Sequence, residues 1–109
     1  MDKELKDLNQ FYGTEHYYNV MGANVTDGVK YIMDNGYSWF VTDMLVILKM
    51  KIREPFCSVK LKVEDSKAEA IITDGNDNKL YSQKYEYTDA KRDLELYFTD
   101  NVLMLSNEY

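Results

Sequence analysis

The spacing of apolar residues changes at Pro55, and no other feature of the chain constrains the fold as strongly. Before Pro55, apolar side chains recur about every 3.6 residues, which is typical of amphipathic helices. After it, residues 57–64 alternate between apolar and polar side chains, which is typical of a half-buried strand. Helices followed by strands along one chain are the order of α+β proteins. The sequence therefore predicts a helical first half and a sheet in the second half.

Three helices are expected before the change of period. The first covers residues 2–11, whose leucine and phenylalanine side chains fall on one helical face. The second covers residues 26–36, with Thr26 as the N-cap and Gly36 as the C-terminal stop. The third covers residues 39–51 and is apolar around most of its circumference, so we expect it to be the buried helix.

Five strands are expected after the change of period, over residues 57–64, 68–73, 80–87, 94–99 and 102–106. Short connections join them, which predicts an antiparallel meander. We therefore expect a single α+β domain over residues 1–109, with about three N-terminal helices packed on one face of a five-stranded antiparallel sheet.

The segment 74–78 reads Asp-Gly-Asn-Asp-Asn, which is a strong signal for a hairpin turn. Its first residues resemble a calcium-binding loop, in which oxygen ligands alternate along the chain. The remaining pattern departs from such a loop, because the sixth position is Lys79 and the twelfth is Tyr85. We expect a turn at this place, and no metal or other cofactor.

Residue usage argues against most enzyme classes. The chain has ten tyrosines but one histidine and one cysteine. Histidine and cysteine are the usual carriers of proton transfer and nucleophilic attack near neutral pH, whereas tyrosine supplies rigid contact area with a polar hydroxyl. We expect a binding protein without enzymatic activity.

The charge distribution bears on partners and on location. The net charge is −6 with no basic block, so binding to duplex DNA is not expected, and an acidic surface suits a basic protein partner, such as a nucleic-acid-binding protein. A lone cysteine, Cys57, fits a reducing compartment. No apolar run is long enough to cross a bilayer, and the first residues lack the profile of a signal peptide. We expect a cytoplasmic protein that does not associate with membranes.

Strand parity selects a candidate partner surface. Tyr81 and Tyr85 share one face of the strand over 80–87, and Tyr97 lies on the opposite parity from the leucines of the strand over 94–99. Tyrosine is enriched in protein interfaces. The predicted partner-binding residues are Tyr81, Tyr85, Tyr97, Glu69, Glu86 and Glu95. Parity alone leaves open the alternative that Tyr81 and Tyr85 face the helices as part of the core.

Two other functions stay open at this point. A small-molecule or enzymatic site would use Glu15, His16 and Asp43 in a pocket between helices and sheet. Single-stranded nucleic acid would stack its bases on the tyrosines of the sheet, although the lysines there are interleaved with acids. A homodimer through a sheet edge is compatible with any of these functions.

Several segments resemble a family of small bacterial proteins that is catalogued as a domain of unknown function. They are residues 8–18, 26–32, 39–43, 87–89 and 102–109. Members of that family are associated with plasmids, integrated elements and phages, and it carries no assigned catalytic residues. The resemblance implies a mobile-element context, in which small acidic proteins often inhibit host defence systems, as anti-CRISPR proteins do. That implication is an association and not a physical argument.

Overall fold

A computed structural model describes residues 5, 8–11 and 13–109. The helix predicted over residues 2–11 falls partly outside these ranges. Within them, the structure shows only the short 3-10 turn η1 (Leu8–Gln10). Leu5 and Leu8 are buried, so the apolar face of this segment does join the core.

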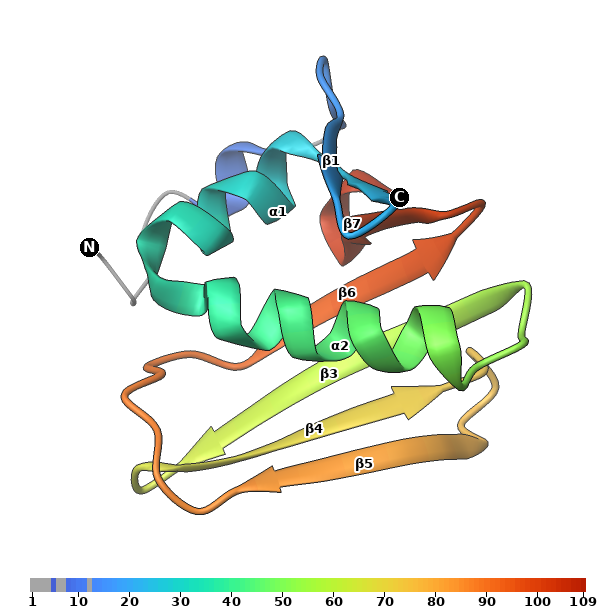
Figure 1. Cartoon of the computed structure of the whole chain (residues 1–109). Helices are drawn as coiled ribbons and strands as arrows, with labels where there is room; N and C mark the ends of the chain where they lie inside the picture. The colour runs from blue at the N-terminus through green and yellow to red at the C-terminus, as the bar shows by residue number, and fades with distance from the viewer. Residues whose placement is uncertain (1–4, 6–7, 12) are drawn as a thin grey trace.

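The helices that follow form one kinked segment (Figure 1). It comprises α1 (Asp27–Ile32), the π-type turn η2 (Met33–Tyr37) and α2 (Ser38–Met50). Gly36 has a φ of 102°, which a glycine adopts without steric cost. The predicted stop is therefore a bend, after which the helix resumes at once. No helix in the described ranges has both the length and the apolar character that crossing a membrane requires.

The described strands form one mixed sheet of seven, in the order β1-β2-β7-β6-β3-β4-β5 (Figure 1). Along the chain they are β1 (Tyr18–Val20), β2 (Ala23–Val25), β3 (Phe56–Glu64), β4 (Lys67–Thr73), β5 (Lys79–Tyr85), β6 (Leu94–Thr99) and β7 (Val102–Leu105), followed by the 3-10 turn η3 (Ser106–Glu108). Neighbouring strands are antiparallel, except that β2 and β7 are parallel.

The prediction of three helices on a five-stranded antiparallel meander is therefore wrong, although each strand expected after Pro55 is present to within about two residues. A β1–β2 hairpin was missed. Its turn uses positive φ at Met21 (54°) and Gly22 (85°), and β2 pairs with β7 across a large sequence separation.

The order of the last strands also differs from a meander, because β6 pairs with β3 and not with β5. The physical reason is apolar content. Leu94 and Leu96 of β6 are buried, so this strand belongs in the centre of the sheet. β5 carries exposed polar side chains such as Ser82 and Lys84, and it lies at the edge, where such residues are tolerated.

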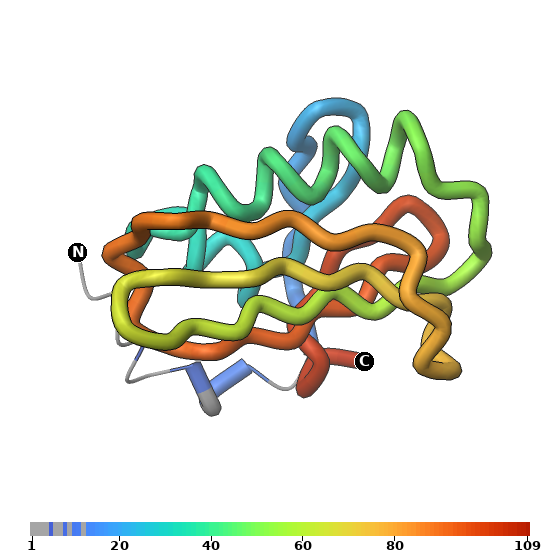
Figure 2. Tube along the Cα trace, turned by 90° about the horizontal axis from the view of Figure 1, so that it is seen from below, coloured from blue at the N-terminus to red at the C-terminus, as the bar shows by residue number. Residues whose placement is uncertain are grey.

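Helix α2 covers one face of the sheet, which we call the inner face (Figure 2). The core lies between them, with Phe40, Met44 and Leu45 of α2 fully or almost fully buried. Strands contribute Val59, Leu61, Ala70, Ile72, Leu96 and Leu103 to the same core. Cys57 belongs to this core as well. The opposite side of the sheet is called the outer face.

Glu108 links the end of the described chain to the start of α1. Its Oε1 accepts hydrogen bonds from Thr26 Oγ1 (2.6 Å) and from the backbone N–H of Leu105 (2.9 Å). Its Oε2 accepts the backbone N–H of Gly28 at 3.1 Å. The Gly28 contact satisfies a donor that the helix start leaves unpaired, and Glu108 places a negative charge at the positive end of the helix.

Candidate functional site

The six residues of the predicted partner surface do not share one face. Tyr81 and Tyr85 lie opposite the buried Ile72 and Ala68 of β4, so their side chains point to the inner face, towards α2. Tyr97 is opposite Ser58 of β3 and points to the outer face. The direction that strand parity left open is thus resolved, and the tyrosines of β5 and β6 belong to two separate surfaces.

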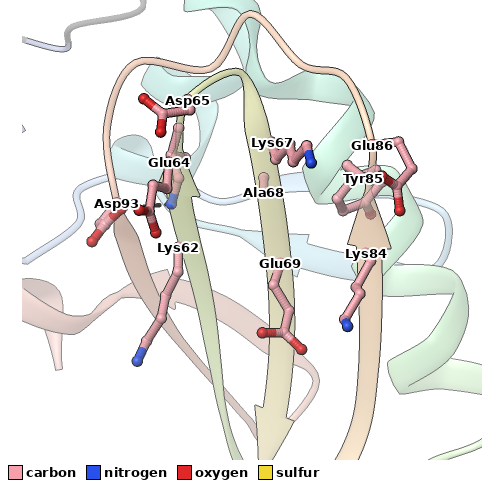
Figure 3. A pocket seen from close by; sticks show the side chains of 11 residues that line it. Lys62, Glu64, Asp65, Lys67, Ala68, Glu69, Lys84, Tyr85, Glu86 and Asp93 are labelled. Atoms are coloured by element: carbon pink, nitrogen blue, oxygen red, sulfur yellow. Dashed lines mark hydrogen bonds between the residues drawn. The ribbon is translucent and has the colours of Figure 1, made fainter.

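The glutamates of that set lie among lysines. On the outer face, Glu69 is the cross-strand neighbour of Lys62 and of Lys84, and the three side chains lie in a row over adjacent strands (Figure 3). Glu95 Oε2 lies 3.9 Å from Lys60 Nζ. Glu69 and Glu95 therefore each have a lysine beside them.

A hollow of about 600 Å³ lies at the end of the sheet where β3 turns into β4 (Figure 3). Charged residues dominate its lining, and Glu86 is one of them. They are Lys62, Lys67, Lys84, Glu64, Asp65, Glu69, Glu86 and Asp93. Because both signs are interspersed, this hollow does not select a ligand by charge.

Three aromatic rings form a cluster elsewhere on the outer face. The ring centroids are 5.2 Å apart for Phe56 and Tyr97, 5.3 Å for Tyr97 and Tyr109, and 5.5 Å for Phe56 and Tyr109. Burial raises the pKa of Tyr97, and the nearby Glu95 carboxylate raises it further. Rings at these separations are already in contact with one another. The three rings also line a hollow of about 250 Å³, and Tyr109 is exposed.

A second arrangement lies between α2 and the edge strand β5, and we call it the α2–β5 groove. It consists of two hollows that share Tyr85. One, of about 280 Å³, is lined by Asp43, Met44, Val46, Ile47, Tyr81, Gln83 and Tyr85. The other, of about 360 Å³, is lined by Trp39, Tyr85, Tyr87, Thr88 and Asp89. The groove thus combines aromatic and aliphatic walls with a few polar groups, which is typical of binding sites.

Tyr85 is the centre of this groove. Its ring packs edge-on against Trp39, with centroids 5.0 Å apart, and its hydroxyl donates a hydrogen bond to Asp43 Oδ2 at 3.0 Å. Burial raises the pKa of Tyr85 far above that of a free tyrosine, and the Asp43 carboxylate adds to the effect. The hydroxyl therefore stays protonated and holds the carboxylate in place.

The backbone beside the groove is unpaired on one side. Within the described chain β5 ends the sheet, so β4 pairs with it on one side and no strand pairs with it on the other. Along such an edge, backbone N–H and C=O groups of alternate residues face outward. β5 is seven residues long, which is sufficient for a second strand to pair with it.

The residues of the predicted enzymatic pocket have different partners. His16 is exposed, and its Nδ1 lies 3.8 Å from Asp27 at the start of α1. The backbone N–H of Glu15 also donates to Asp27. Asp43, by contrast, contacts Tyr85 on the far side of the helical bend. Among the described residues, no hydrogen bond joins Asp43 to Glu15 or to His16.

The 74–78 segment is a turn, as predicted. Asp74 Oδ1 accepts the backbone N–H groups of Asn76 (2.8 Å) and Asn78 (3.3 Å). Asp74 Oδ2 accepts the side-chain amide of Asn78 at 2.8 Å. These three donors lower the pKa of Asp74, with the side-chain amide of Asn78 contributing most. In the described part of the chain, no group of three or more histidine, cysteine or acidic residues is placed to hold a metal.

Trp39, Val46 and Tyr87 belong to the groove but were not among the predicted site residues. The sequence did contain a signal for Trp39 and Val46. A helix that is apolar on most of its circumference has more apolar surface than one sheet face covers, and Trp39, Val46 and Met50 follow one another at helical spacing. Val46 and Met50 are indeed exposed.

Comparison with known proteins identifies a family but no function. No curated protein and no solved structure matches the chain at a significant level. The model of one family matches residues 2–109, which is nearly the whole chain. The chain therefore belongs to the family of unknown function DUF6876.

Proposed function

We propose that this chain is a non-enzymatic protein-binding domain that takes up an extended segment of a partner along the free edge of β5. The observation that carries the proposal is the combination of an unpaired edge of seven residues with the α2–β5 groove beside it. In strand addition of this kind, main-chain hydrogen bonds supply affinity, and pockets for alternate side chains supply specificity.

The groove has the features of a binding hot spot. Trp39 and Tyr85 are partly exposed and held against each other, so a side chain that covers them gains aromatic contact without ordering loose residues. Val46 and Tyr87 extend the apolar surface on either side of this pair, and both are exposed. A partner strand therefore meets a rigid wall, which reduces the entropic cost of binding.

The non-enzymatic part of the proposal rests on the placement of the reactive side chains. Cys57 is fully buried, and burial raises the pKa of its thiol, which disfavours the nucleophilic thiolate. His16 is exposed and lies beside Asp27, which itself accepts backbone hydrogen bonds near the start of α1. Neither residue adjoins the α2–β5 groove.

The biological part of the proposal rests on the family resemblance. We place the domain in the cytoplasm, as a product of a mobile element or phage that inhibits a host defence system in the manner of anti-CRISPR proteins. Its partner would be a basic nucleic-acid-binding protein, which the net charge of −6 favours. The genes that adjoin those of family members test this part: phage or plasmid genes support it, and an ordinary chromosomal setting overturns it.

The binding surface can be tested without a known partner. A displayed library of random peptides of about ten residues, long enough to pair along β5, is selected on the full chain. Binding of the enriched peptides is then measured on two variants. Val46→Arg fills the groove from its exposed rim, and Tyr97→Ala removes a ring from the outer face. Urea unfolding establishes that both variants remain folded.

We expect Val46→Arg to weaken the enriched peptides by about tenfold or more, and Tyr97→Ala to leave them unchanged. Hydrogen exchange should also slow at the outward amides of β5 when peptide is bound. Peptides that lose affinity on Tyr97→Ala and keep it on Val46→Arg would instead locate the binding surface on the outer face.

A further inference from the structure

The charged groups that line the α2–β5 groove have one sign. Asp43 lines the hollow beneath α2, and Asp89 lines the adjoining hollow beyond Tyr85. Among the described residues that line either hollow, none is a lysine or an arginine. Lys84 of β5 is on the opposite parity and lines the charged hollow of the outer face. The lining of the groove therefore differs from that of the outer-face hollow, where lysines and acids are interspersed.

The aromatic side chains around these carboxylates are suited to a cation. Trp39 and Tyr85 form the wall, and Tyr87 is 85% exposed at its end. The face of an aromatic ring attracts an ammonium or a guanidinium group, and a guanidinium also stacks on it. A carboxylate beside such rings adds charge-assisted hydrogen bonds to the same group. Exposed aromatic rings and carboxylates are each common on protein surfaces, but here a ring and a carboxylate line the same hollow.

Strand geometry delivers a side chain to this place. A strand added to β5 lies about 4.8 Å from it, and its alternate side chains point to the inner face. The residue opposite Tyr85 then extends along the Tyr85 ring. Because Asp43 Oδ2 lies 3.0 Å from the Tyr85 hydroxyl, a long side chain that follows the ring ends at this carboxylate.

We propose that the α2–β5 groove is specific for an extended segment that places an arginine against Asp43, with the guanidinium packed on the aromatic wall. This inference rests on the proposed strand addition at β5, and it names the partner chemistry as a basic strand. A second copy of the chain fits less well. The groove-facing residues that its own β5 would offer are Tyr81, Gln83 and Tyr85, and none of these is cationic.

The test uses a set of peptides with one alternating Thr–Val background and a central Arg, Lys, Gln or Glu. Their binding to the full chain is measured by fluorescence anisotropy at low and at high salt. Asp43→Lys is the test variant, since Asp43 is exposed and its replacement leaves the core intact. Glu69→Lys is the matched control, because it changes the net charge equally on the outer face.

On the wild-type chain, we expect the Arg peptide to bind about tenfold more tightly than the Gln peptide, and this preference to decrease with salt. Asp43→Lys should abolish the preference and favour the Glu peptide instead. Glu69→Lys should retain the order found for the wild type. If the preference reverses with Asp43→Lys and not with Glu69→Lys, the central side chain of the peptide contacts residue 43. A general effect of net charge would change both variants equally.

Other results separate this inference from the function on which it rests. Equal binding of all peptides, with hydrogen exchange slowed along β5, overturns the arginine specificity and leaves strand addition standing. Absence of binding at β5 by any peptide overturns both. A dimer in analytical ultracentrifugation that Val46→Arg dissociates identifies a second copy as the occupant, and it also overturns both.

Discussion

Replacing Glu108 with alanine should destabilise the domain by about 3 kcal/mol, which is a large effect for a partly exposed residue. One carboxylate accepts three hydrogen bonds, from Thr26 Oγ1 and from the backbone N–H groups of Gly28 and Leu105. All three donor residues are buried. The substitution therefore leaves buried donors unpaired, and it also removes the negative charge at the start of α1.

The magnitude follows from the number and type of bonds. A hydrogen bond to a charged group contributes about 1.5 kcal/mol at the lower end of its range, so three of them give about 4.5 kcal/mol before the access of water is considered. Because Glu108 is itself partly exposed, water can reach part of the vacated space and recover some of that free energy. About 3 kcal/mol remains, which corresponds to a decrease in Tm of roughly 12 °C or more for a domain of this size.

Urea unfolding followed by tyrosine and tryptophan fluorescence measures this free energy, with three variants. Glu108→Gln retains one oxygen acceptor, and we expect it to lose about half as much as Glu108→Ala. Gly28→Ala places a Cβ 2.5 Å from Glu108 Oε1, so it should destabilise the wild type more than it destabilises the Glu108→Ala background. If Glu108→Ala is as stable as the wild type to within about 0.5 kcal/mol, the capping argument is refuted.

Three further predictions concern titratable groups. The pKa of Asp27 is lowered, chiefly by the backbone N–H of Glu15. The contribution of Asp27 to stability is therefore present above about pH 4 and is lost as the pH falls through the folded-state pKa. In urea unfolding, Asp27→Asn should make stability depend less on pH in the acid range. Burial raises the pKa of Tyr85 further than that of Tyr97, so ultraviolet titration should show tyrosines that ionise after the exposed ones, and Tyr85→Phe should remove the last of them. The thiol of Cys57 is fully buried, and it should react with a disulfide reagent only as fast as the chain unfolds; rapid reaction under native conditions would contradict the placement of this residue in the core.

Local signals were reliable where the neighbouring residues in the sequence decide the conformation. The alternation over residues 57–64 predicted β3, because a half-buried strand has a period of two. The 74–78 turn was predicted because aspartate and asparagine bond their own backbone, and Asp74 does so. Gly36 marked a change of backbone direction for a similar local reason, namely its positive φ.

The candidate site was predicted only in part, for a reason that strand parity makes clear. Tyr81, Tyr85 and Tyr97 were recognised as the informative tyrosines of the sheet, but parity relates residues within one strand and does not state which face α2 covers. Tyr81 and Tyr85 turned out to face α2, while Tyr97 faces away from it. The partners of Tyr85, namely Trp39 and Asp43, lie more than forty positions earlier and are brought near only by folding.

The sequence by itself determined where α1, α2 and the strands after Pro55 lie, because periodicity, caps and turns act over a few residues. The tertiary structure alone decided that β6 inserts beside β3, that β2 joins β7 in parallel, and that β5 is left at the edge. These pairings depend on which strands can bury enough apolar area beneath α2, and that competition involves the whole chain at once. The free edge of β5 and the groove beside it are products of that competition.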